Sequence, residues 1–393
     1  MTNKLQWTVV NTCRMVVSAT FVFSGVVKLV DPHGTAFKIH DYLVALHLLD
    51  VVSSPLLPLV AAILLGVTEF VLGICLFFGI QRRTIIALMS FLTACYTPLT
   101  LWLAVTDAVT DCGCFGDAVH LSNWETFGKN VFLLCLLAVL WRKRKLLMRF
   151  ISQSLQWIVS LFTVLYALFL TGLCLYGEPI IDFRPFHIGQ NIPLAMTWPE
   201  DPSLQPEILD FAIEPLNADE SLTTDAILAD SSFTFLLIAP RLEQADDSDL
   251  ECINALCDYA QYYGYRFLCL TASGDSAIHR WQDMTGAEYP FAFTDELILK
   301  TMVRSNPGLL LLHDGTIVGK WSHQMLPVAS EMKAPLHKLS LAHPKREAYH
   351  SILLELLLWY LIPLAVLMLL DRTYASIRWW KRRKKREVEM KNA

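Results

Sequence analysis

Charged residues are scarce in this chain, and that scarcity limits its class. Asp, Glu, Lys and Arg make up only 18% of the 393 residues, whereas 54% are hydrophobic and the mean hydropathy is +0.42. Several apolar runs approach or reach the roughly 20 residues that cross a bilayer core. A wholly soluble protein is therefore excluded, and we predict an α-helical protein that spans the lipid bilayer several times.

The apolar runs predict six membrane-spanning helices. An N-terminal secretory signal is the competing interpretation of the first run, but its apolar core is longer than is usual for a signal. Residues 33–54 mix apolar and polar positions at helical spacing, which favours a helix lying in the membrane interface. The predicted spans lie at residues 9–30, 56–80, 84–105, 131–141, 155–175 and 352–370, and the fourth is long enough only if it begins near residue 124.

Positive charge is scarce in one large block of the chain. Residues 177–350 contain 11 Lys and Arg against 25 Asp and Glu, whereas the rest contains 21 against 12. Basic residues beside spans are typically cytoplasmic, so the acidic block and the 107–127 loop are expected on the outer side. The tail at 381–386 is then a topology anchor near anionic lipid, and no nucleic-acid partner is needed. The basic positions are Arg14, expected to snorkel to the inner surface, Arg82, Arg83, residues 142–145 and the tail.

Two cysteines one residue apart, Cys112 and Cys114, interrupt the hydrophobic first half of the chain. A Cys-Gly-Cys pair can close into a small, strained disulfide of the labile, oxidising kind. Gly113 and Gly116 permit tight backbone conformations and are expected to leave both sulfurs accessible. Outside the cytoplasm such a dithiol can be held oxidised. We therefore favour thiol-disulfide chemistry, with a structural bridge as the alternative.

The loop lacks the ligands of a closed metal site. Two thiolates need a third and a fourth partner to hold zinc, and only His120 is near in sequence, so no metal is predicted. Lys28, Lys129 or the start of the fourth span could favour a thiolate. Asp111 and Asp117, which flank the pair, oppose it by charge.

Glu69 lies near the middle of the second predicted span. A carboxylate at that depth is costly unless it is protonated, paired or in a polar cavity, which makes it a candidate functional residue. A neutral acid that hydrogen-bonds between helices is the alternative. With Tyr96 and Thr97, it could line a quinone or proton path. A transporter that uses Glu69 is disfavoured because no inverted repeat is visible between the two halves.

Residues 233–325 change to an alternating pattern that predicts a layered α/β domain, after an extended lead-in at 177–232. Cys252 and Cys257, five residues apart on a predicted helix, are too far apart for a bridge, and Cys269 is expected in the core. The pattern predicts strands at 233–239, 265–271, 309–313 and 316–321, and helices at 249–263, 276–285 and 295–303.

The sequence from Asn306 to Trp321 resembles the C-terminal half of a thioredoxin-like domain, in which Pro307 corresponds to the cis-proline. The loop at 241–247, where that family carries Cys-x-x-Cys, has no cysteine. We therefore expect a docking platform for a substrate rather than a second redox site.

The first 140 residues resemble the DoxX-like and methylamine-utilisation MauE group of four-helix membrane proteins. With the thioredoxin-like domain and last span, the arrangement is similar to DoxX-family membrane proteins of Bacteroidetes. This implies a four-helix domain at 1–145, further helices at 153–176 and 351–371, a cytoplasmic tail at 372–393 and a place in the bacterial inner membrane, with the acidic block periplasmic. The motif residues are Arg14, residues 23–25, Lys28, Asp31, Pro32, residues 41–43, Glu69, Phe70, Leu72, Gly73, residues 111–117, Thr126, Phe127, Lys129 and Asn130.

The resemblance also implies an association with disulfide formation or electron transfer in the envelope. The favoured hypothesis is a membrane thiol-disulfide or quinone-linked oxidoreductase, similar in plan to vitamin K epoxide reductase. One of Cys112 and Cys114 would exchange with a thiol of an envelope protein, and the other would resolve the mixed disulfide. The alternative is a non-enzymatic assembly or maturation factor whose acidic domain binds a secreted client, with the cysteines only bracing their loop.

Overall fold

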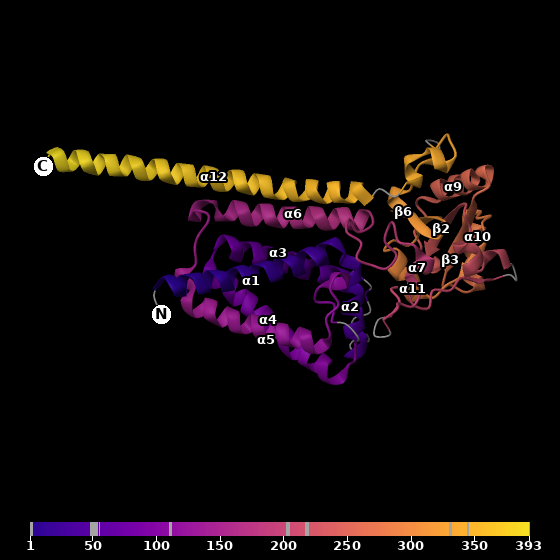
Figure 1. Ribbon diagram of the computed structural model, residues 1–393, viewed down its shortest axis with the longest axis horizontal. Helices are drawn as coiled ribbons and strands as arrows, with labels where there is room; N and C mark the ends of the chain where they lie inside the picture. Colours follow the sequence, from indigo (N-terminus) through magenta and orange to yellow (C-terminus); the bar gives the residue numbers. More distant parts are fainter. Residues whose placement is uncertain are drawn as a thin grey trace. The chain divides into compact units, whose positions relative to one another are not determined.

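The computed structural model describes residues 3–47, 54, 56–109, 112–201, 205–216, 220–329, 332–343 and 346–392. The chain divides into two compact units (Figure 1). The first, here the membrane unit, comprises Met1–Gly172 and Leu353–Ala393. The second, here the sheet unit, comprises Leu173–Ile352.

The membrane unit is helical. Among the described residues, six helices are long and apolar enough to cross a membrane, which confirms the six predicted spans. The fourth begins at Asn123, as its length required, and the last continues as a helix through the basic tail. The helices are α1 (Asn3–Val30), α2 (Pro32–Ala45), α3 (Leu56–Phe78), α4 (Arg82–Thr106), α5 (Asn123–Lys143), α6 (Gln156–Tyr176) and α12 (Arg346–Asn392).

Two helix starts that flank the candidate site are fixed by local capping. Asp31 precedes α2 and accepts a hydrogen bond from the Gly34 amide at 2.9 Å, with Pro32 in the first turn. Ser122 and Glu125 form a capping box at the start of α5. The predicted interfacial helix at 33–54 corresponds to α2, and residues 48–53 lie outside the described part of the chain.

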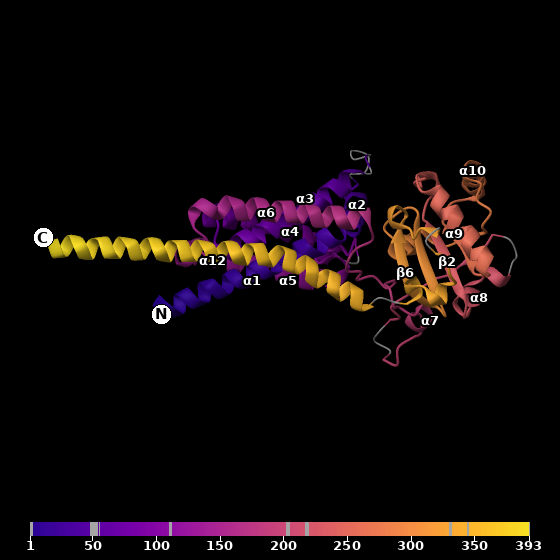
Figure 2. The ribbon, with the colours of Figure 1, turned by 90° about the horizontal axis from the view of Figure 1, so that it is seen from above.

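Helices α1 and α3 lie side by side and approach closely (Figures 1 and 2). A Cβ atom at Gly25 would lie 2.5 Å from the Phe70 amide nitrogen, and one at Gly73 would lie 2.8 Å from the Val22 amide nitrogen. Small residues therefore allow the two backbones to meet, as is common between membrane helices.

The connection between α5 and α6 is held by buried polar side chains. Arg14 does not snorkel to the surface as expected: it is only 1% exposed and donates to the Met148 carbonyl at 2.8 Å. At the same end, Asp371 of α12 accepts a hydrogen bond from the Ser152 amide at 2.8 Å. Helices α6 and α12 also contact each other through Thr163 and Tyr360, whose hydroxyls are 3.0 Å apart.

The sheet unit contains a six-stranded mixed sheet in the order β1-β4-β3-β2-β5-β6. Strands β2, β3 and β4 are parallel, whereas the β1–β4, β2–β5 and β5–β6 pairs are antiparallel. The strands are β1 (Glu214–Pro215), β2 (Phe233–Ala239), β3 (Arg266–Thr271), β4 (Phe291–Phe293), β5 (Gly308–His313) and β6 (Thr316–Ser322). The main helices are α7 (Ile192–Ala195), α8 (Thr224–Leu228), α9 (Leu250–Tyr263), α10 (Asp275–Thr285) and α11 (Glu296–Met302).

Both faces of the sheet are buried, which explains the continuous apolar run of β2. Phe235 and Leu237 point into a core shared with α9 and α10, whereas Leu236 and Ile238 point into a second core with α7, α8 and α11. Cys269 is fully buried, as expected. The lead-in predicted at 177–232 is more than an extended segment, because its side chains Phe186, Ile192, Phe211 and Ile227 are part of the second core. The Asn306–Pro307 peptide bond that precedes β5 is cis.

Candidate functional site

The loop that joins α4 to α5, residues 107–122 and here the cysteine loop, turns back onto the helices. Gly113 and Gly116 have φ angles of +63° and +53°, which favour glycine. A Cβ atom on Gly113 would lie 2.8 Å from Lys38 Cγ of α2, and one on Gly116 would lie 2.8 Å from Val27 Cγ1 of α1. Glycine is therefore required by both conformation and space.

The two sulfurs face each other, with Cys112 Sγ 3.0 Å from Cys114 Sγ. The expectation that both are accessible is wrong for Cys112, which is 7% exposed. The loop packs inward because the Tyr42 hydroxyl of α2 donates to the Cys112 carbonyl. The two cysteines line one cavity of about 90 Å³ within the membrane unit.

The environments of the two thiols differ. The hydrogen bond between the two sulfurs lowers the pKa of Cys114 to about 6; burial opposes this shift, and the Lys129 and Lys28 cations support it. The same hydrogen bond and burial raise the pKa of Cys112. The surroundings therefore favour the thiolate at Cys114 over the thiolate at Cys112.

Beside the pair lies a buried ion pair between α1 and α3. Lys28 Nζ is 2.8 Å from Glu69 Oε2, and both side chains are 4% exposed. The hydroxyls of Ser24 and Tyr96 hydrogen-bond to the two Glu69 oxygens at 2.7 and 2.9 Å. The carboxylate thus has the partners that a charge at this depth requires.

The ion pair is connected directly to the cysteine loop. Lys28 Nζ and Ser24 Oγ each lie 2.8 Å from the Cys114 carbonyl oxygen. These two side chains are one turn apart on α1, and Lys28 also donates to Ser24 Oγ at 2.6 Å. The position of Cys114 is therefore fixed by the residues that pair with Glu69.

A second cation approaches the pair from α5. Lys129 Nζ lies 4.2 Å from the centroid of the Phe115 ring, which packs edge-on against Phe23 of α1. Lys129 also lines the cavity that holds both sulfurs. Asp117 lies in the short 3-10 turn Gly116–Ala118. Asp111 lies outside the described residues.

Residues 6–142 match the family model of the methylamine utilisation protein MauE. This part of the chain is MauE-like. The match contains α1 to α5, both cysteines and the Lys28–Glu69 pair. Comparison with curated proteins and with solved structures found no match.

Sequence reasoning placed some residues of the MauE-like site and missed others. Ser24 and Tyr42 entered only as members of the family pattern, although the i, i+4 spacing of Ser24 and Lys28 was a usable signal. Thr97, predicted beside Glu69, instead donates to the Thr93 carbonyl one turn back in α4.

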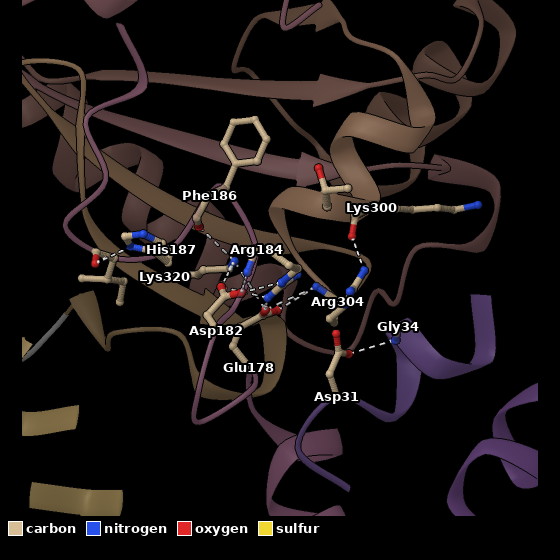
Figure 3. A network of polar contacts seen from close by, with 12 residues as sticks. Asp31, Gly34, Glu178, Asp182, Arg184, Phe186, His187, Lys300, Arg304 and Lys320 are labelled. Carbon is tan, nitrogen blue, oxygen red and sulfur yellow. Dashed lines mark hydrogen bonds and ion pairs between the residues drawn. The ribbon is translucent and has the colours of Figure 1, made fainter. Parts of the chain in front are cut away.

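The sheet unit has a buried ionic cluster of its own, formed by Glu178, Asp182, Arg184 and Lys320 (Figure 3). Lys320 Nζ lies 2.7 Å from Asp182 Oδ2, and Arg184 Nε lies 2.6 Å from Asp182 Oδ1. Burial alone would raise the pKa of Asp182, but the two cations hold it at about 2. Glu178 also accepts from the Arg304 amide at 3.0 Å, two residues before the cis Asn306–Pro307 bond.

The three cysteines of the α/β part of the sheet unit are partly or wholly buried. Cys252 is half-buried, while Cys257 and Cys269 are buried and burial raises their pKa values. Among the described residues, no group of three or more His, Cys, Asp or Glu side chains is placed to hold a metal ion.

Proposed function

We propose that this MauE-like chain is a membrane thiol-disulfide protein that acts on thiols of envelope proteins during the maturation of a redox system. The observation that carries the proposal is the pairing of Cys112 with Cys114. Their sulfurs are 3.0 Å apart, and a hydrogen bond and two lysines favour a thiolate at Cys114. A pair that only braced its loop would not need a stabilised thiolate.

The asymmetry of the pair defines the order of the exchange. Starting from the Cys112–Cys114 disulfide, a client thiolate attacks the Cys112 sulfur, and the bond to Cys114 breaks. Cys114 leaves as the thiolate, since the thiol of lower pKa is the better leaving group. A second client thiol then attacks the mixed disulfide. The client leaves with a disulfide, and the pair is left reduced by two electrons.

Reoxidation of the pair requires an acceptor of two electrons, and a quinone is the chemical class that we favour. Phe21 and Leu133 contribute apolar walls to the cavity beside the sulfurs. Lys129 also lines this cavity and offers a cation that a quinone carbonyl could contact. These residues fit such a group, which when bound would supply two-electron oxidation of the dithiol.

We further propose that the sheet unit is a thioredoxin-like docking domain and that the whole chain is a DoxX-type protein of the bacterial inner membrane. The strand order β3-β2-β5-β6, with β2 and β3 parallel and β5 and β6 antiparallel, supports the thioredoxin-like assignment. The charge distribution of the chain supports a periplasmic side for the 107–127 loop and residues 177–350.

The exchange is tested with full-length protein in detergent. The protein is equilibrated with dithiothreitol buffers of increasing oxidation, alkylated and digested, and the mass of the peptide with residues 112–114 is measured. We expect a reversible change between two alkylated thiols and none. Cys112→Ser and Cys114→Ser should both abolish oxidation of added client thiols, while Cys252→Ser should not. Thiols that never form a disulfide would contradict the proposal.

The second candidate is the assembly factor, and the burial of Cys112 favours it because a protein thiol does not reach a buried sulfur without movement of the loop. It predicts that deletion of residues 230–325 abolishes client maturation in cells, whereas the two Cys→Ser variants only lower the amount of protein. Loss of maturation at normal protein level in both cysteine variants would exclude it.

A further inference from the structure

Lys28 connects Glu69 to the cysteine pair. Its ammonium lies 2.8 Å from the Glu69 carboxylate and 2.8 Å from the Cys114 carbonyl oxygen, and both side chains line the cavity that holds the two sulfurs. The Lys28 charge lowers the pKa of Cys114, whereas the Glu69 charge raises it. The two members of one ion pair therefore act on the same sulfur with opposite sign.

We propose that Lys28 and Glu69 act as a charge pair that sets the reduction potential of Cys112–Cys114: Lys28 favours the reduced pair, and Glu69 favours the disulfide. This rests on the proposed function, since it requires that the pair be oxidised and reduced. Both are positioning residues, because neither forms a bond to the reacting sulfurs.

The charge of the cysteine pair changes when it is reduced. Reduction breaks the S–S bond, adds two electrons and one proton at neutral pH, and leaves a thiol at Cys112 and a negative charge on Cys114. A cation nearby lowers the free energy of that state, and an anion nearby raises it, with little screening in a buried cavity. In the disulfide form, Lys28 and Glu69 neutralise each other, and the sulfurs carry no charge.

Other ionisable groups face the same cavity and stay unchanged in the test. They are Tyr96 from α4, Lys129 from α5, and Lys38 and Tyr42 from α2. Lys129 lowers the pKa of Cys114, as Lys28 does, so the reduction potential depends on the charges of Lys28, Glu69 and Lys129 together. Only Glu69 opposes them among the described residues that line this cavity.

The sign of the effect separates this role from a merely structural one. Removing either member of a buried ion pair leaves an unpaired charge, so both single variants are expected to destabilise the fold. A structural disturbance would therefore shift the reduction potential of the cysteine pair in the same direction in both variants. A charge effect shifts that potential in opposite directions.

The test measures the equilibrium between the pair and dithiothreitol at pH 7 in the full-length protein, with Lys28→Met, Glu69→Gln and the double variant. Lys28→Met should shift the exchange equilibrium about tenfold toward the disulfide, equivalent to about 30 mV for two electrons. Glu69→Gln should shift it by a similar factor toward the dithiol, and the double variant should lie near the unaltered protein. Shifts of the same sign, or none, would overturn the proposal.

Variants that keep the charge make the test independent of folding. Lys28→Arg and Glu69→Asp retain each sign and should remain within about twofold of the unaltered protein, whereas the charge effect itself is about tenfold. A larger shift in these two would show that packing rather than charge sets the potential, and would also overturn the proposal. If the unaltered protein forms no disulfide at any ratio, the proposed function fails instead.

Discussion

Each unit of the protein buries an ionic cluster, and the two clusters differ in what they touch. In the membrane unit, Lys28 pairs with Glu69 and donates to the carbonyl of Cys114 beside a cavity. In the sheet unit, Lys320 and Arg184 are balanced by two carboxylates, and Lys320 also donates to the Phe186 carbonyl at 3.2 Å.

The two clusters differ in whether a charge beside them changes with redox state. The sheet-unit cluster has two cations and two anions, whose charges balance. The membrane-unit pair lies beside Cys114, whose charge changes on reduction in the exchange that we propose. On that proposal, similar buried side chains stabilise the fold in one unit and set the charge balance of the cysteine pair in the other.

The largest expected effect is on the sheet-unit cluster. Lys320→Met leaves Asp182 and Glu178 with one cation and should lower the free energy of unfolding by about 3–5 kcal/mol. Limited proteolysis of the full-length protein in detergent measures it. Lys300→Met is the control, because Lys300 is 36% exposed in its pair with Glu296 and should cost no more than about 0.5 kcal/mol.

The comparison predicts that Lys320→Met leaves the alkylation of Cys114 unchanged. A change in that reactivity would mean that the two clusters are coupled, and the separation of their roles would be wrong.

A smaller effect is expected where α1 meets α3. Gly25→Ala places a methyl group against the Phe70 backbone and should cost about 1–3 kcal/mol. It should also disturb the contact between Ser24 and Glu69, and so change the reactivity of Cys114. Gly128→Ala in α5 is the matched control: no atom lies within 4 Å of its Cβ position, and its effect should be about 1 kcal/mol or less. Equal losses in both variants would contradict the close packing.

The smallest effect is expected from Lys129→Met. Its cation supports the lowered pKa of Cys114, so its loss should raise the midpoint of thiol alkylation from about pH 6 by about one unit. The thiolate is present above the midpoint and is lost as the pH falls through it, so the variant should react more slowly near pH 6.5. The rate of alkylation by iodoacetamide between pH 5 and 9 measures this. An unchanged midpoint would show that Lys129 does not lower the pKa of Cys114.

Much of the fold could be predicted because its signals are local. The six spans and strand β2 are continuous apolar runs, and each has a helix or strand at the expected place. Strands β1 and β4 were missed because two and three residues are too short for a pattern. The inward turn of the cysteine loop was missed because it depends on contacts with α1 and α2.

The sequence identified individual residues of the site but not the contacts between them. Lys28 and Glu69 were each candidates, yet their pairing follows from the packing of α1 against α3 at Gly25 and Gly73, which a sequence pattern does not reveal. The Cys114 carbonyl as the shared acceptor of Lys28 and Ser24 had no sequence signal.

The most direct test is the redox state of Cys112 and Cys114 in intact cells, trapped with a membrane-impermeant maleimide before and after a reductant. The account predicts that neither cysteine is labelled at first, that both are labelled after reduction, and that Cys114→Ser traps a mixed disulfide at Cys112. Two thiols that are labelled equally with and without reductant would contradict it.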